Sequence, residues 1–136
     1  YATPDLKTKL KSIQNDLFDL GADLCVPISE NNNGRLRVST SQIETLEAEI
    51  DEMNNILKPL NSFILPGGCK SATFLHLART ICRRAERSVV SLRSKEEIND
   101  NTLIYLNRLS DWLFVASRIE NQENSTEVLW SPGKNK

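Results

Sequence analysis

The sequence predicts an all-α protein, most simply an up-and-down helical bundle, and three observations support that prediction. Four long segments repeat their apolar residues at intervals of three and four, no pairs of strands are evident, and no motif recurs at a fixed period. The 136 residues, 39% of them hydrophobic, suffice for one domain with a substantial core. We therefore expect residues 1–136 to form a single helical domain.

The first predicted helix begins at Thr3 and Pro4, because threonine caps helices well and proline fits the first helical turn. Its apolar residues share one face, and they are Leu6, Leu10, Ile13, Leu17, Leu20 and Leu24. Residues 26–40, which include the run Asn31-Asn32-Asn33-Gly34, are typical of a loop.

The second predicted helix opens at Ser41, where Glu44 completes a capping box, and Pro59 ends it. Its apolar residues form a narrow seam, and they are Ile43, Leu46, Ile50, Met53 and Leu57. Alternating steps of three and four are the pattern of antiparallel bundle packing.

Residues 62–70 are apolar and then glycine-rich, which predicts an extended segment that turns into the third helix at Ser71. That helix is expected to run to about Ser91, and its apolar face consists of Ala72, Leu75, Ala78, Ile81, Cys82, Ala85 and Val89. The turn at residues 66–68 lacks the spacing of a phosphate-binding loop, so a tight turn before a helix is the favoured interpretation.

The fourth predicted helix starts between Ile98 and Asn101 and ends near Glu120. Its buried stripe consists of Leu103, Leu106, Leu109, Leu113 and either Ala116 or Ile119. Residues 121–136 are expected to form a polar tail with an isolated Trp130.

Net charge, hydropathy and cysteine spacing argue against several classes of protein. Seventeen basic and eighteen acidic residues give a net charge of −1, which argues against a general nucleic-acid binder. No apolar run approaches the length of a membrane span. The three cysteines have no CxxC spacing, so a reducing compartment is favoured over a disulfide framework or a zinc site.

Arginines gather on the third predicted helix. His76, Arg79, Arg83 and Glu86 follow at steps of three, four and three, so they lie along one stripe. Charged residues in such a stripe are often only the solvent-exposed face of a helix. Spacing alone does not distinguish an exposed face from a binding site. In an otherwise neutral chain, however, the cluster is suited to binding a polyanion, because one guanidinium group can bind two phosphate oxygens at once. The single histidine is expected to have a structural role rather than to bind metal or act in catalysis.

The fourth predicted helix carries a second polar stripe, formed by Asn107, Asp111, Phe114 and Arg118. It is either a solvent face or, for Asp111, a contact with an arginine of the third helix. No Ser-His-Asp set, paired-carboxylate site or cysteine nucleophile can be assembled from the sequence.

Five segments together resemble the trimeric-type ATP:cob(I)alamin (corrinoid) adenosyltransferases, over about residues 5–120. They are LFDLGADL at 17–24, FILPGG at 63–68, HLART at 76–80, CRRAER at 82–87 and LNRLSDWLF at 106–114. The resemblance implies a five-helix bundle, of which four helices are visible here, assembled as a homotrimer with active sites between subunits.

The resemblance also implies roles for single residues. Arg83, Glu86 and Asn107 would contact ATP or its Mg²⁺, with Glu86 reaching the ion only indirectly. Arg79 would stand at the subunit interface and help to shape the site, and Phe63 would press on the lower face of the corrin ring. Asp111 would support the site from the fourth helix.

The implied reaction transfers the 5′-deoxyadenosyl group of ATP to cob(I)alamin and releases triphosphate. The alternatives are a non-catalytic cobalamin carrier with the same bundle and a plain helical oligomerisation module. A reductase and a cobalamin-dependent mutase would be partners, in the bacterial cytoplasm or the mitochondrial matrix.

The family pattern also includes a Gly/Thr-rich nucleotide-binding segment and a first helix with an Asp-Glu-Leu motif, neither of which precedes Tyr1 here. We therefore expect the chain to be a fragment of a longer protein, with part of the triphosphate cradle and the acidic partner of Arg79 outside it.

Overall fold

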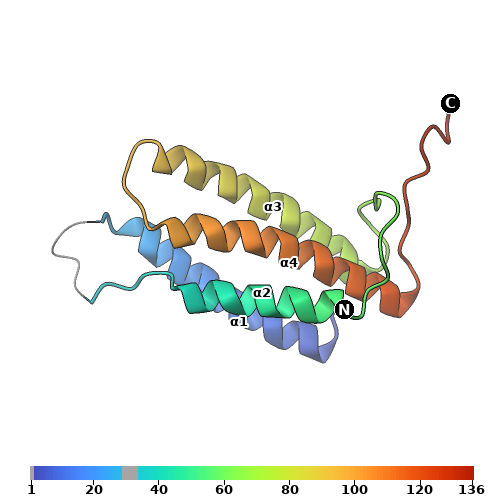
Figure 1. Ribbon diagram of the computed structural model, residues 1–136, viewed down its shortest axis with the longest axis horizontal. Coiled ribbons are helices and arrows are strands. Elements are labelled where there is room, and N and C mark those ends of the chain that lie inside the picture. Colours follow the sequence, from blue (N-terminus) through green and yellow to red (C-terminus); the bar gives the residue numbers. More distant parts are fainter. Residues whose placement is uncertain (1, 29–33) are drawn as a thin grey trace.

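The computed structural model describes residues 2–28 and 34–136, and this part of the chain is an up-and-down bundle of helices (Figure 1). The helices are α1 (Pro4–Cys25), α2 (Thr40–Asn54), α3 (Lys70–Arg93) and α4 (Asp100–Asn124). Helix α4 runs between α2 and α3 and packs against both, so it is the centre of the bundle (Figure 1). The all-α prediction is confirmed, whereas the asparagine run of the expected loop, 31–33, lies outside the described residues.

The predicted start of α1 is confirmed, because the Thr3 hydroxyl accepts a hydrogen bond from the Leu6 N–H at 3.4 Å. The predicted cap of α2 was wrong. The capping residue is Ser39, whose N–H donates to Gln42 Oε1 at 3.0 Å. A glutamine amide oxygen serves a capping box as well as a glutamate does, and the sequence offers both registers.

Two other helix ends differ from the prediction. Helix α3 is capped by Cys69 and begins one residue before Ser71, and α4 continues to Asn124. The longer α4 corrects the expected tail, since Asn121 is buried at 1% exposure within the helix.

The core lies along α4, where Tyr105 and Trp112 are the largest fully buried side chains. The Tyr105 hydroxyl donates to Asp16 of α1 at 2.9 Å, and the Trp112 indole donates to Glu49 of α2 at 2.7 Å. Each buried polar tip thus has a partner, as burial requires.

The predicted apolar face of α3 is only partly in the core. Leu75, Cys82 and Val89 are buried, but Ile81 is 49% exposed and Ala85 is exposed as well. The reason is that α3 packs closely on α4 alone, so its opposite side stays open in the described part of the chain.

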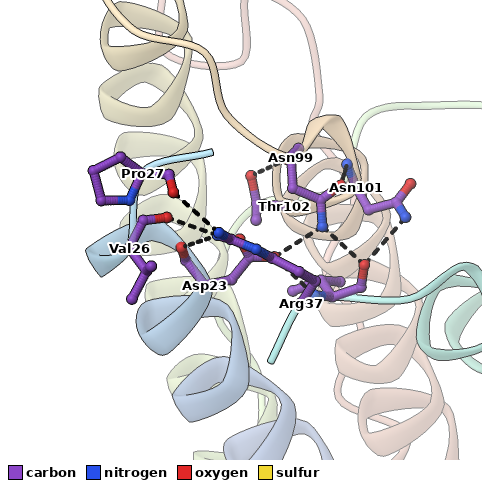
Figure 2. A network of polar contacts seen from close by, with 8 residues as sticks. Asp23, Val26, Pro27, Arg37, Asn99, Asn101 and Thr102 are labelled. Atoms are coloured by element: carbon purple, nitrogen blue, oxygen red, sulfur yellow. Dashed lines mark hydrogen bonds and ion pairs between the residues drawn. The ribbon is translucent and has the colours of Figure 1, made fainter. Parts of the chain in front are cut away.

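The Asp23 network ties the ends of three helices together (Figure 2). The Asp23 carboxylate, 1% exposed, pairs with Arg37 Nη1 at 2.8 Å and accepts from the Val38 N–H at 2.7 Å and from Asn99 Nδ2 at 2.8 Å. Arg37 also donates to the carbonyls of Val26 and Pro27. A buried carboxylate is stable here because every contact it makes is with a donor.

The C-terminal segment is not a free tail. Leu129 forms an isolated antiparallel bridge with Ile64, the Leu65 N–H donates to the Val128 carbonyl at 2.9 Å, and the Trp130 N–H donates to the Phe63 carbonyl at 2.7 Å. The isolated Trp130 of the prediction was therefore wrong, because its ring also meets that of Phe63 edge-on. Neither segment alternates apolar and polar residues, so strand-pattern reasoning missed the pairing.

Candidate functional site

A surface pocket of about 310 Å³ lies between α3 and α4, and it joins residues that the sequence singled out. Its lining consists of Arg83, Glu86, Arg87, Val90 and Asn107. The first four follow at steps of three, one and three, so one face of α3 presents them together, and α4 contributes the amide.

The residue that α4 contributes to the pocket, Asn107, is exposed and has two side-chain hydrogen bonds. Asn107 Nδ2 donates to Glu86 Oε2 at 2.9 Å, while Asn107 Oδ1 accepts from Arg108 Nη2 at 2.6 Å. Arg108 pairs in turn with Asp111 at 2.9 Å, within α4. The hypothesis that Asp111 contacts an arginine of α3 was therefore wrong, and its link to the pocket runs through Arg108.

The pocket is electropositive. Within the described ranges, neither Arg83 nor Arg87 forms an ion pair, although Arg37 and Arg118 of the same chain each pair with a carboxylate. Unpaired guanidinium groups at the edge of a pocket favour an anion with several oxygens, such as a polyphosphate.

A second group on α3 surrounds the ring of Phe114. The guanidinium carbon of Arg79 lies 5.2 Å from the ring centroid, and the His76 ring meets it edge-on at 6.5 Å. His76 Nε2 and Arg79 Nε are buried without a hydrogen-bond partner among the described residues. Burial, followed by the charge of Arg79, lowers the pKa of His76, so the imidazole favours its neutral form.

Phe63 lies before the N-terminal end of α3, with 75% of its surface exposed. Its ring centroid is 5.8 Å from that of Trp130, a contact that no sequence pattern indicated. The only hint was the short apolar run 128–130 in a polar segment.

The structure therefore brings Arg83, Glu86 and Asn107 together, whereas Phe63, Arg79 and Asp111 do not line their pocket. No group of three or more potential metal ligands from His, Cys, Asp and Glu occurs in the described part of the chain. None of the helices in that part is long and apolar enough to cross a membrane.

Comparison with known proteins identifies the family to which this chain is similar. A family model described as "Cobalamin adenosyltransferase" matches residues 2–120. The corrinoid adenosyltransferase of Mycobacterium tuberculosis is 48% identical over 127 residues, which cover 91% of this chain and 65% of that protein. The corrinoid adenosyltransferase of Bacillus subtilis is 47% identical over 117 residues, which cover 86% of this chain and 59% of that protein. The chain thus spans about two thirds or less of the lengths of these two relatives.

A solved structure has the same bundle. It is a variant PduO-type ATP:corrinoid adenosyltransferase from Lactobacillus reuteri, complexed with cobalamin and ATP. It superposes with a TM-score of 0.87 at 38% identity, over 94% of this chain and 71% of that one. The chain belongs to the cobalamin adenosyltransferase family.

Proposed function

We propose that this chain carries the nucleotide- and corrinoid-binding helices of an enzyme that transfers the 5′-deoxyadenosyl group of ATP to cob(I)alamin. Adenosylcobalamin and triphosphate are the products. The observation that supports this most is the pocket in which unpaired Arg83 and Arg87 stand beside the Glu86–Asn107 pair. The L. reuteri relative, complexed with cobalamin and ATP, supports the same pair of substrates.

In this proposal the arginines hold the polyphosphate. Arg83 offers a planar set of donors to phosphate oxygens, and Arg87 adds a second positive charge at the same pocket. Asn107 is kept in one orientation by Glu86 and Arg108, so its amide is preorganised toward the nucleotide.

Mg²⁺ fits the pocket only as a companion of the nucleotide. Glu86 is its single carboxylate, and one of the two Glu86 oxygens already accepts from Asn107. Magnesium commonly binds through one or two carboxylates together with substrate phosphates and water. Glu86 would therefore hold the ion indirectly, and the ion would neutralise charge on the triphosphate.

The chemistry needs no nucleophile from the protein. Cob(I)alamin attacks C5′ of ATP, the Co–C bond forms, and the C5′–O bond breaks as triphosphate departs. The residues that line the pocket include no serine, cysteine, histidine or lysine. Their work is orientation of ATP and stabilisation of the charge that builds on the leaving group.

Phe63 serves the other substrate. An aromatic ring with most of its surface exposed is suited to a large, flat, apolar ligand, and we place it against the lower face of the corrin ring. There it would keep a lower ligand from cobalt, which makes Co(II) easier to reduce because ligation tunes the potential of a metal.

Two features of α3 support assembly with other subunits. Buried His76 Nε2 and Arg79 Nε lack partners in the described part, and Leu77 and Ile81 are about half exposed on the same helix. Buried polar atoms are normally satisfied, so a neighbouring subunit is expected to contact α3 near His76 and Arg79. We propose a homotrimer with Arg79 at the interface.

The cellular setting is inferred from the reaction. A reductase must supply electrons to cobalt, and a cobalamin-dependent mutase would use the product. We place the reaction in the cytoplasm, with the mitochondrial matrix as the alternative.

The test is transfer by the full-length protein, followed through the absorbance of the Co–C bond. Arg83→Ala is expected to lower turnover by about 10³-fold, because a charge contact made with the leaving group is lost. Arg93→Ala is the charge-matched control, since Arg93 lies on the same helix in an exposed pair with Asp100.

The control is expected to keep activity within about twofold of wild type. Equal activity of the two variants would remove Arg83 from the site. Binding of both substrates without formation of the Co–C bond would favour the carrier hypothesis.

A further inference from the structure

The exposed ring of Phe63 is held by a segment that the proposed reaction does not use, residues 126–130. The Phe63 carbonyl accepts from the Trp130 N–H at 2.7 Å, and two residues further the Leu65 N–H donates to the Val128 carbonyl. The Ser62 hydroxyl donates to the Trp130 carbonyl at 3.0 Å. Backbone bonds on both sides thus fix the register of Phe63 against Trp130.

The side chains of the two residues also meet. The ring planes of Phe63 and Trp130 are inclined at 62°, an edge-to-face arrangement. Trp130 is itself 44% exposed, so burial in the core does not explain its large ring. With this contact in place, 75% of the Phe63 surface is still exposed.

The two paired segments share one anchor on α4, the buried side chain of Asn121. Asn121 Nδ2 donates to the Gly67 carbonyl at 2.9 Å, and Oδ1 accepts from the Cys69 N–H at 3.0 Å and the Thr126 hydroxyl at 2.8 Å. Phe63 and Trp130 are therefore placed by the same rigid helix.

An ion pair made by a buried arginine reinforces the anchor one turn earlier. Arg118, 7% exposed, pairs with Glu127 at 3.1 Å and donates to the Lys58 carbonyl at 2.9 Å. Glu127 precedes the paired residues 128–130, and Lys58 precedes the Phe63 segment. Arg118 of α4 thus also holds the chain just before each of the two segments.

We propose that Trp130 is a positioning residue for the corrinoid: it holds the Phe63 ring in the orientation that meets the corrin face. The inference rests on the proposed function, in which Phe63 contacts that face. A phenylalanine on an unsupported loop would lose ring freedom when the ligand binds, whereas a ring fixed beforehand does not. The structure supplies that support through the backbone pairing and the edge contact.

The first test needs no ligand. The chain has four phenylalanines, so fluorophenylalanine labelling gives a spectrum with few resonances, in which Phe63→Leu identifies that of Phe63. Trp130→Leu, which keeps an apolar side chain without a ring, is expected to shift the Phe63 resonance and leave those of Phe18, Phe74 and Phe114 in place. Val128→Ala is the control, because it removes an exposed side chain and keeps the paired carbonyl.

The second test measures kinetics and the state of cobalt in the full-length protein. Trp130→Leu is expected to raise the KM for the corrinoid by about fivefold or more and to keep the KM for ATP within about twofold. It should also lower the fraction of bound cob(II)alamin that has lost its lower ligand, as seen in its absorbance. Trp130→Phe retains an aromatic edge and is expected to restore both values to within about twofold of wild type.

The outcomes separate the inference from the proposed function. An unmoved Phe63 resonance in Trp130→Leu, or equal increases in both KM values, would overturn the positioning role. A wild-type protein that forms no Co–C bond would refute the proposed reaction, while the fluorine spectrum would still decide whether Trp130 orients Phe63. If Trp130→Leu fails to fold, the kinetics of Trp130→Phe decide instead, and a loss as large as that of Phe63→Ala counts against the proposal.

Discussion

Two polar regions of this bundle differ in whether their arginines have partners within the chain. Arg37 in the Asp23 network donates to a buried carboxylate and to three carbonyls, of Asp23, Val26 and Pro27, all within the chain (Figure 2). On α3, Arg83 and Arg87 line a pocket without an ion pair among the described residues, and Arg79 has a buried nitrogen with no partner there. The polar groups of the Asp23 network are satisfied from within the chain, whereas we assign a ligand or another subunit to the unpaired arginines of α3.

The same substitution in both regions tests that contrast. Arg37→Met is expected to lower the free energy of unfolding by about 3 kcal/mol, because it leaves the Asp23 charge buried and unpaired. Arg83→Met is expected to change it by less than about 0.5 kcal/mol, since no internal partner is lost. Urea unfolding of the two variants measures both values.

The contrast would break if the two variants lost equal stability. It would sharpen if Arg37→Met, at temperatures where it stays folded, bound ATP as the wild type does while Arg83→Met did not. Fold and site would then be separable within one bundle.

Arg79 is expected to give a smaller effect, of the opposite sign. Arg79→Met removes a buried guanidinium nitrogen that has no partner in the described part of the chain, and it keeps the bulk of the side chain against Phe114. The stability of the isolated subunit should stay equal or rise by up to about 1 kcal/mol. Sedimentation should show weaker self-association, and an unchanged oligomer would take Arg79 out of the interface.

The smallest expected effect is a pH dependence due to His76. Its pKa is lowered in the folded chain, first by burial and then by Arg79, so the unfolded chain binds the proton more readily. Stability is therefore expected to fall as the pH falls through the ordinary histidine value, near 6.5, toward the lowered folded value. The chain has one histidine, so His76→Gln should flatten this slope between about pH 7.5 and 5.5.

Thermal unfolding at several pH values measures the slope. A slope that survives in His76→Gln would assign the effect to other groups. A slope lost only when a second subunit is present would instead connect it with assembly.

Much of the fold could be predicted because it depends on local spacing. The apolar intervals predicted four helices, and the step of three between Arg83 and Glu86 was enough to predict that they share one face of α3, whereas Arg87 was not part of that prediction. Asn107 could be suspected because it is a polar residue in an apolar helix, but its bond to Glu86 depends on how α3 and α4 pack.

The remainder depends on contacts between distant residues. Asp23 and Asn99 are 76 residues apart in the sequence, and two helices separate Phe63 from Trp130. No local sequence pattern therefore predicts either contact. The cap of α2 was missed for another reason, because Ser39 with Gln42 and Ser41 with Glu44 are equally good boxes by sequence. Packing selected one of them.

The most direct measurement is a structure of the full-length protein with ATP and cobalamin bound. We expect that triphosphate oxygens lie within hydrogen-bond distance of the Arg83 guanidinium, that the nucleotide contacts the Glu86–Asn107 pair, and that the Phe63 ring lies against the corrin. A nucleotide bound elsewhere, with the α3 arginines surrounded only by water, would contradict the proposed function.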